Sequence, residues 1–383
     1  MNKRLTRGKV LGLFLLTGLC VFMGVKIASV FTLRSSDSAF DNGAIAVGAG
    51  TAIHEEGATV TIQIAAPETA VTMVTDAHAI TPAWMHDGAF YPRFPLEQAA
   101  TPIAADPWDM LHWPRAQWRD SRFELFSWDR YPEILIIDLA TLAIQEQFFH
   151  RLAFFVEKAG FRGRLSHDHE IGHLHGWNAH NYRDYDLARF FRIARETDFP
   201  LLPEEWELEA ILMRHGVITL DAAGRIIPGR GAILTLTRES VPILRTRFMV
   251  HEVFHGLYFI DEDFREFSRQ RWEIFPEFAR NFLLAFFALQ EYDIEYEFLV
   301  INEFMGHLLQ LPVAQASWFF AQHTANRLWR EGLGHVLPER YEIRDGVRFW
   351  PELASVFTAE TQVFSDHVYE RWGLEAGRVW RPR

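Results

Sequence analysis

The sequence predicts an α+β fold in which a small β-sheet is followed by a helix-rich C-terminal lobe. Two short apolar runs, residues 133–137 and 231–237, have the branched side chains typical of buried strands. The C-terminal third instead carries apolar residues at helical spacing, in residues 276–290 and 295–311. Hydrophobic residues make up 49% and charged residues 23% of the 383 residues. This balance is typical of a globular protein with a sizeable core.

The main domain is expected to span residues 123–383, after a spacer at residues 34–122 that contains a short β element at residues 58–64. Residues 84–118 lack periodicity and are expected to form an irregular connection. Apolar spacing and helix-start or helix-stop residues predict the earlier helices. These helices are expected at residues 142–159, 186–196, 203–215 and 240–259.

The first 33 residues have the pattern of a signal anchor or a signal peptide. Four basic side chains lie within the first nine residues and precede an apolar stretch at residues 10–25. Small residues are poorly placed for cleavage at residues 27–29, which favours an uncleaved anchor. We therefore expect a membrane-anchored, extracytoplasmic protein, either periplasmic or at the cell surface.

Charge and cysteine content exclude several kinds of chemistry. The net charge is -12, and no basic cluster follows the first nine residues, so a nucleic acid is not expected as a partner. The single cysteine, Cys20, lies inside the N-terminal apolar stretch. The exported part is therefore expected to have no disulfide, and any metal site there must use histidines and carboxylates.

Residues 251–255 spell His-Glu-Val-Phe-His within an apolar helical pattern. Four residues separate His251 from His255, which places both imidazoles on one helix face, where they can bind one zinc ion. Glu252 then points toward the water that the metal activates, and we expect it to be the general base. The sequence thus predicts Zn²⁺ as cofactor and a hydrolase.

The same pattern occurs a second time at residues 169–173, and helical context favours the copy at 251–255. Gly172 lies inside the earlier copy and Gly176 follows it, which makes residues 169–173 a poor helix. The earlier copy also lies in a histidine-rich tract, residues 167–180, where a chance match is more frequent.

With this helix, residues 231–310 resemble the zincin metallopeptidases, and in particular their gluzincin branch. In that branch a glutamate on a later helix, within an Asn-Glu pair and followed by a small residue three positions on, is the third ligand. Asn302, Glu303 and Gly306 match this pattern, so the resemblance implies that Glu303 binds the zinc. His307 stands where the branch often has an aspartate that orients a zinc-bound histidine. A buried carboxylate at Glu303 would also be costly without a partner.

Two other carboxylates, Glu277 and Asp261, remain alternatives for the third ligand. The resemblance further implies a peptide or protein substrate, aligned by backbone pairing along residues 231–237 as the edge strand of the sheet. The sequence does not identify the side chain that stabilises the developing oxyanion. The available donors are Tyr296, His323 and His335.

Two alternative functions stay open. The histidine-rich tract also resembles the zinc-binding segment of polysaccharide deacetylases, which would use Asp138 at the end of the strand 133–137 together with His175 and His180. In the other alternative, the chain is a non-catalytic metal-binding envelope protein that keeps the helix at 251–255 without the chemistry.

Overall fold

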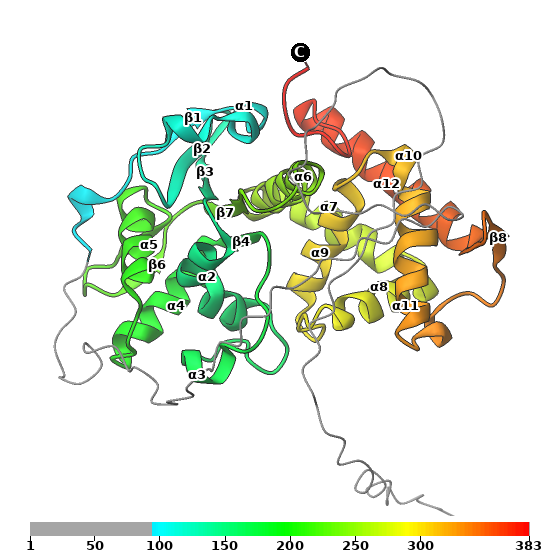
Figure 1. Ribbon diagram of the computed structural model, residues 1–383, viewed down its shortest axis with the longest axis horizontal. Helices are drawn as coiled ribbons and strands as arrows, with labels where there is room; N and C mark the ends of the chain where they lie inside the picture. Colours follow the sequence, from blue (N-terminus) through cyan, green and yellow to red (C-terminus); the bar gives the residue numbers. More distant parts are fainter. Residues whose placement is uncertain (1–93, 383) are drawn as a thin grey trace, which may run out of the picture. The chain divides into compact units, whose positions relative to one another are not determined.

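The computed structural model describes residues 94–382, which contain one mixed five-stranded sheet (Figure 1). Its strand order is β1-β2-β3-β7-β4. The pairs β1/β2 and β3/β7 are parallel, whereas β2/β3 and β7/β4 are antiparallel. The strands are β1 (Ile103–Ala105), β2 (Phe123–Trp128), β3 (Tyr131–Leu139), β4 (His180–Arg183) and β7 (Ala232–Thr237).

The helices are concentrated in the C-terminal part. Before the last strand of the sheet lie α1 (Pro107–His112), α2 (Leu142–Val156), α3 (Asp168–Ile171), α4 (Asp184–Glu196) and α5 (Pro203–Arg214). After it come α6 (Pro242–Ile260), α7 (Glu262–Ile274), α8 (Glu277–Leu289), α9 (Glu297–Leu309), α10 (Val313–Trp318), the π-helical turn η4 (Phe319–Thr324), α11 (Ala325–Arg330) and α12 (Pro351–Trp372). Two small hairpins, β5 (Ile218–Leu220) with β6 (Ile226–Pro228) and β8 (Glu342–Arg344) with β9 (Val347–Phe349), complete the described fold.

The sheet separates two hydrophobic cores, because successive residues of a strand point to opposite faces. Ile134 and Ile136 of β3 pack into the core that also contains the apolar side chains of α6 and the C-terminal helices. Leu135 and Ile137 pack into the second core, with α2, α4 and α5. Figure 1 shows these two groups of helices on the two sides of the central α6 and the sheet. Helix α6 therefore lies between the sheet and the C-terminal lobe.

The predicted combination of a small sheet with a helical C-terminal part is confirmed, but the predicted edge strand is wrong. β7, the strand before α6, pairs with β3 on one side and β4 on the other. All six of its residues are buried, as expected for a central strand. The edge strands are β1 and β4, and β4 begins at His180, the last residue of the histidine-rich tract.

The sheet also begins earlier in the sequence than expected. β1 pairs with β2, so residues 103–105, which the sequence analysis placed in the irregular connection, belong to the sheet. The predicted N-terminal membrane segment and the β element at residues 58–64 lie outside the described residues. Within residues 94–382, no helix is both long enough and apolar enough to cross a bilayer.

A buried ion cluster fixes the start of α6 on the sheet. The Asp138 carboxylate, on β3, accepts hydrogen bonds from Arg245 Nη1 at 2.8 Å and Arg245 Nη2 at 3.1 Å. Arg238 forms a second ion pair with the same carboxylate, at 2.6 Å. Because Arg245 lies in the first turn of α6, this cluster sets the position of the helix that carries residues 251–255.

We expect Asp138→Ala to lower the free energy of unfolding by about 3–5 kcal/mol, because it leaves two guanidinium groups without their carboxylate in a largely buried setting. Denaturant unfolding measures the change. Glu133→Ala is the matched control on the same strand, because its partner Arg230 is 78% exposed, and pairs of that kind contribute only about 0–1 kcal/mol. Equal losses in the two variants would contradict this role of Asp138.

Candidate metal centre

Helices α6 and α9 meet at a glycine that brings their polar faces together. The ring atom His255 Cε1 would lie 2.6 Å from a Cβ atom at position 306, and His251 Cε1 would lie 2.9 Å from it. These distances are shorter than any relaxed contact, so only a glycine lets α9 approach the two imidazoles. The small residue of the Asn-Glu pattern, Gly306, thus allows the close approach of the two helices.

The imidazoles of α6 converge on the Glu303 carboxylate of α9. His251 Nε2 lies 3.6 Å from Glu303 Oε2, and His255 Nε2 lies 3.7 Å from Glu303 Oε1. The two Nε2 atoms are 2.8 Å apart. Tetrahedral zinc, with bonds of about 2.0–2.1 Å, places its ligand atoms about 3.3 Å apart. The three side chains are therefore grouped as zinc ligands are, and small rotations would suffice to bind one ion.

The electrostatics of this group also favour a cation. Glu303 is 1% exposed, and within the described chain its Oε2 accepts no hydrogen bond. Burial raises the pKa of Glu303, while His255 and the Tyr292 hydroxyl act in the opposite direction. Burial lowers the pKa of both His251 and His255 to about 4, so both imidazoles are neutral near pH 7, as metal ligands must be. The donor set of nitrogen and oxygen atoms fits zinc.

A chain of side-chain hydrogen bonds orients the site. His255 Nδ1 donates to Asn302 Oδ1 at 2.8 Å, which directs the lone pair of Nε2 toward His251 and Glu303. Asn302 Nδ2 donates in turn to Asn181 Oδ1 at 3.5 Å, and Asn181 Nδ2 donates to Glu252 Oε2 at 2.9 Å. Asn181 belongs to the edge strand β4, so this chain connects the sheet, α6 and α9.

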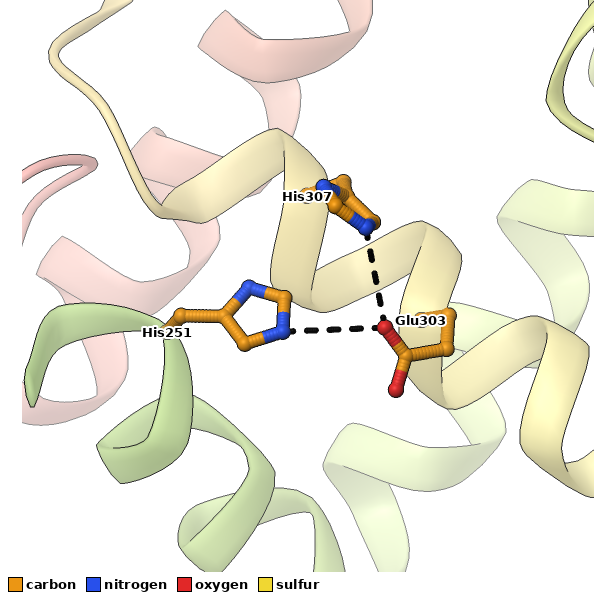
Figure 2. A group of neighbouring side chains, drawn as sticks. All are labelled: His251, Glu303 and His307. Atoms are coloured by element: carbon orange, nitrogen blue, oxygen red, sulfur yellow. Dashed lines mark ion pairs between the residues drawn. The ribbon is translucent and has the colours of Figure 1, made fainter. Parts of the chain in front are cut away.

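A fourth residue that the sequence analysis did not select, His307, joins the group. His307 Nε2 lies 3.6 Å from Glu303 Oε2 (Figure 2). His251, Glu303 and His307 offer ligand atoms that all lie within 4.8 Å of one another, close enough to hold one metal ion. Gln310 Nε2 donates to His307 Nδ1 at 2.9 Å. In this arrangement His307 Nδ1 accepts, so the proton of the neutral ring lies on Nε2.

A cavity of about 370 Å³ opens beside the metal centre. His251, His307 and Glu252 line it, together with Glu157 and Tyr292. Glu252 is 4% exposed. Burial raises its pKa well above the ordinary value, the hydrogen bond from Asn181 lowers it, and the charge of Glu303 raises it further. The carboxyl group next to the metal centre therefore faces a space where a substrate could bind.

The alternative third ligands lie elsewhere. Glu277 is exposed at the first position of α8. Asp261 caps α7, where its Oδ1 accepts from Phe264 N at 2.8 Å, and it pairs with Arg371 at 2.6 Å. Of the carboxylates considered as third ligand, the structure thus brings only Glu303 to the two histidines.

The three donors considered for the oxyanion have different positions. Only His323 lines the cavity beside the metal centre. The Tyr296 hydroxyl accepts from Arg183 Nη2 at 2.8 Å, and His335 lines a different cavity. Tyr292, which the sequence analysis did not consider, lines the metal-centre cavity. A hydrogen bond with its hydroxyl lowers the pKa of the Glu303 carboxyl. No sequence pattern around Tyr292 indicates this role.

The second copy of the motif does not form a comparable centre. Helix α3 ends at Ile171, before Gly172, so residues 169–173 do not lie on one helix. His169 and His173 are both exposed. In the same segment, Glu170 pairs with Arg164 and accepts from His167 N at 2.8 Å. These contacts give the segment a local structural role.

The residues proposed for a deacetylase are not brought together either. Asp138 binds arginines on the α6 side of the sheet. His180 lies on the opposite face, where its ring stacks on Phe149 of α2 at 5.7 Å. His175 is separate from both and lines the cavity beside the metal centre.

We expect Gly306→Ala to abolish tight zinc binding, because the new methyl group would overlap both imidazoles. Gly256→Ala is the matched control on α6, because the nearest atoms to its Cβ would be side-chain methyl groups of Ile134, at 3.1 Å, and Leu234, at 3.3 Å, away from the imidazoles. Zinc analysis after dialysis, with circular dichroism to confirm folding, measures the difference. Full zinc content in Gly306→Ala would contradict the proposed ligand arrangement.

We expect zinc binding at pH 5.5 to release fewer than two protons, because the two imidazoles contribute almost none. Because burial lowers the pKa of His251 and His255 to about 4, both are already neutral at this pH. Two exposed histidines would instead release close to two further protons. Titration calorimetry in buffers of different ionisation enthalpy counts the protons. A release of two or more would show that the imidazoles titrate as exposed groups.

Comparison of the chain with models of protein families, with curated proteins and with solved structures found no match.

Proposed function

We propose that this protein is a zinc-dependent hydrolase, most plainly a peptidase, in which His251, His255 and Glu303 hold the metal and Glu252 is the general base. The observation that carries the proposal is the position of Glu252. A metal site that only stabilises the fold does not require a buried carboxyl group that faces a cavity and accepts a hydrogen bond from a neighbouring side chain. A zinc hydrolase requires such a group as its general base.

Zinc bound at this site would supply a Lewis acid that polarises a substrate carbonyl and increases the acidity of water. Glu252 would accept a proton from the attacking water and then deliver it to the leaving nitrogen, so that one water is consumed and one amide bond is broken. Asn181 would hold the Glu252 carboxylate in the orientation that this transfer requires. Asn302 would keep His255 in the tautomer that leaves Nε2 free.

We also propose a substrate class and a location for the protein. The proposed substrate is a peptide or protein, and the proposed location is extracytoplasmic, with the N-terminal segment as a membrane anchor. The support for this location is the order of basic and apolar residues in the first 33 positions.

The position of His307 favours a second candidate, a non-catalytic metal-binding protein. If His307 joined the other three side chains as a fourth ligand, zinc would be fully coordinated, as in structural sites. The hydrogen bond from Gln310 to His307 Nδ1 argues against this, because it places a proton on the nitrogen that would have to bind the metal. We therefore favour three protein ligands and an open position.

We expect Glu252→Gln to keep its zinc and its fold and to lose at least about 100-fold in the rate of peptide hydrolysis. Glu170→Gln provides the matched control, because it makes the same change in the second copy of the motif, where the side chain pairs with Arg164 outside the metal centre. The assay uses the zinc-loaded full chain and a library of internally quenched fluorescent peptides.

Two results would contradict the proposal. Unchanged hydrolysis by Glu252→Gln would remove Glu252 from the reaction. A zinc-loaded wild-type chain that hydrolyses no member of the library, with its zinc coordinated by four protein ligands, would favour the non-catalytic candidate.

A further inference from the structure

The cavity beside the metal centre contains two arginines that have no acidic partner within the described chain. Arg247 lies on α6 one turn before His251, and Arg327 lies on α11; both line the cavity. Other arginines of the protein, such as Arg245, bind carboxylates. Arg247 and Arg327 form no ion pair with any residue in 94–382, and the buried Nε of Arg247 donates no hydrogen bond there. A guanidinium in this setting lacks the partner that normally offsets its burial.

Aromatic side chains hold the two guanidinium groups in place. Arg247 Cζ lies 5.4 Å from the centre of the Phe319 ring, and Arg327 Cζ lies 5.8 Å from the Phe286 ring. The Phe319 ring also stacks with His307 at 6.1 Å and with His323 at 5.7 Å. The side chains of Arg247 and Phe319 are therefore adjacent to His307 of the metal centre.

The spacing of residues along the helices places these side chains on the same side of the cavity. Phe319, His323 and Arg327 are spaced four residues apart along η4 and α11, and all three line the cavity. The π-helical turn η4 lies in this segment, and such turns are frequent at functional sites. On α6, Arg247 and His251 are also four residues apart, so one side of the cavity combines the arginines with a metal-centre histidine.

Different charged groups act on two residues of the cavity lining. Burial raises the pKa of Glu157 well above the ordinary value, and the charges of Glu303 and Glu252 raise it further. Burial lowers the pKa of His323, and the charges of Arg247, Arg327 and Arg330 lower it further. The arginines therefore act on His323, whereas the carboxyl groups act on Glu157.

The geometry points to Arg247 and Arg327 as an anion-binding subsite that takes the free C-terminal carboxylate of a peptide, which would make this protein a carboxypeptidase. This inference rests on the proposed peptidase function. Arginine binds carboxylates through two parallel hydrogen bonds, which also fix their orientation.

Distance and volume agree with a terminal carboxylate. One helical turn, about 5.4 Å, separates Arg247 from His251 along α6, and one extended residue spans about 3.3–3.6 Å. On this backbone spacing, a carboxylate bound by Arg247 would lie one or two residues beyond a bond held at the metal centre. The cavity volume of about 370 Å³ is at the small end of ligand pockets, which span about 300–1,000 Å³. It suits a chain end better than a continuous polypeptide.

The experiment uses N-acetylated octapeptides of mixed sequence, prepared once with a free C-terminal carboxylate and once as C-terminal amides. Mass spectrometry follows cleavage by the zinc-loaded full chain. We expect release of one or two residues from the C-terminus, with the free acids cleaved at least about tenfold faster than the amides. Arg247→Gln and, independently, Arg327→Gln should remove this preference. Arg330→Gln, on the same helix but outside the cavity lining, should keep it.

Binding measurements separate this inference from the proposed function. In the Glu252→Gln background, calorimetry should give at least about tenfold tighter binding of the free acids than of the amides, and Arg247→Gln should abolish the difference. Arginine-dependent binding without any cleavage by the wild type would support the subsite and contradict the peptidase. Equal cleavage of acids and amides would overturn the subsite and leave the peptidase standing. Preference for amides that carry an internal glutamate would also overturn it, because the anion would then be a side chain.

Discussion

The structure depends on one unusual constraint, a group of buried polar side chains between two otherwise apolar helices. Glu303 and the imidazoles of His251 and His255 lie where the core of the C-terminal lobe would normally be hydrocarbon. An ionised group in such a place costs several kcal/mol unless a partner offsets the loss of water. The described residues supply hydrogen bonds around the edge of the group but no cation at its centre. A bound metal ion would satisfy all three side chains at once.

Several contacts of the surrounding fold position this group of side chains. The sheet fixes the start of α6 through Asp138, and the edge strand β4 reaches the site through Asn181. Gly306 then lets α9 lie directly against the imidazole rings. Because the same contacts leave Glu252 beside a cavity, the elements that stabilise the metal centre also create the space for a substrate.

Sequence periodicity predicted the parts of the site that are local. The helix around residues 251–255 and the helix with Glu303 both have clear apolar spacing. The Asn-Glu pair, taken from the family resemblance, indicated Glu303, whose carboxylate lies 3.6–3.7 Å from the two histidines. His307 was within reach of the same reasoning, since it follows Glu303 by four residues. The edge strand was missed because β4 has only four residues, His-Asn-Tyr-Arg, and owes its conformation to pairing with β7. The cavity walls, such as Glu157 and Tyr292, come from distant segments that only tertiary packing brings together.

The most direct test of the metal centre is anomalous diffraction from a crystal of the zinc-loaded protein, recorded on both sides of the zinc absorption edge. We expect one peak at about 2.0–2.2 Å from His251 Nε2, His255 Nε2 and a Glu303 carboxylate oxygen. We also expect His307 Nε2 to lie outside bonding distance. A crystal with no peak at this position, or with its peak between His169 and His173, would contradict the proposed metal centre.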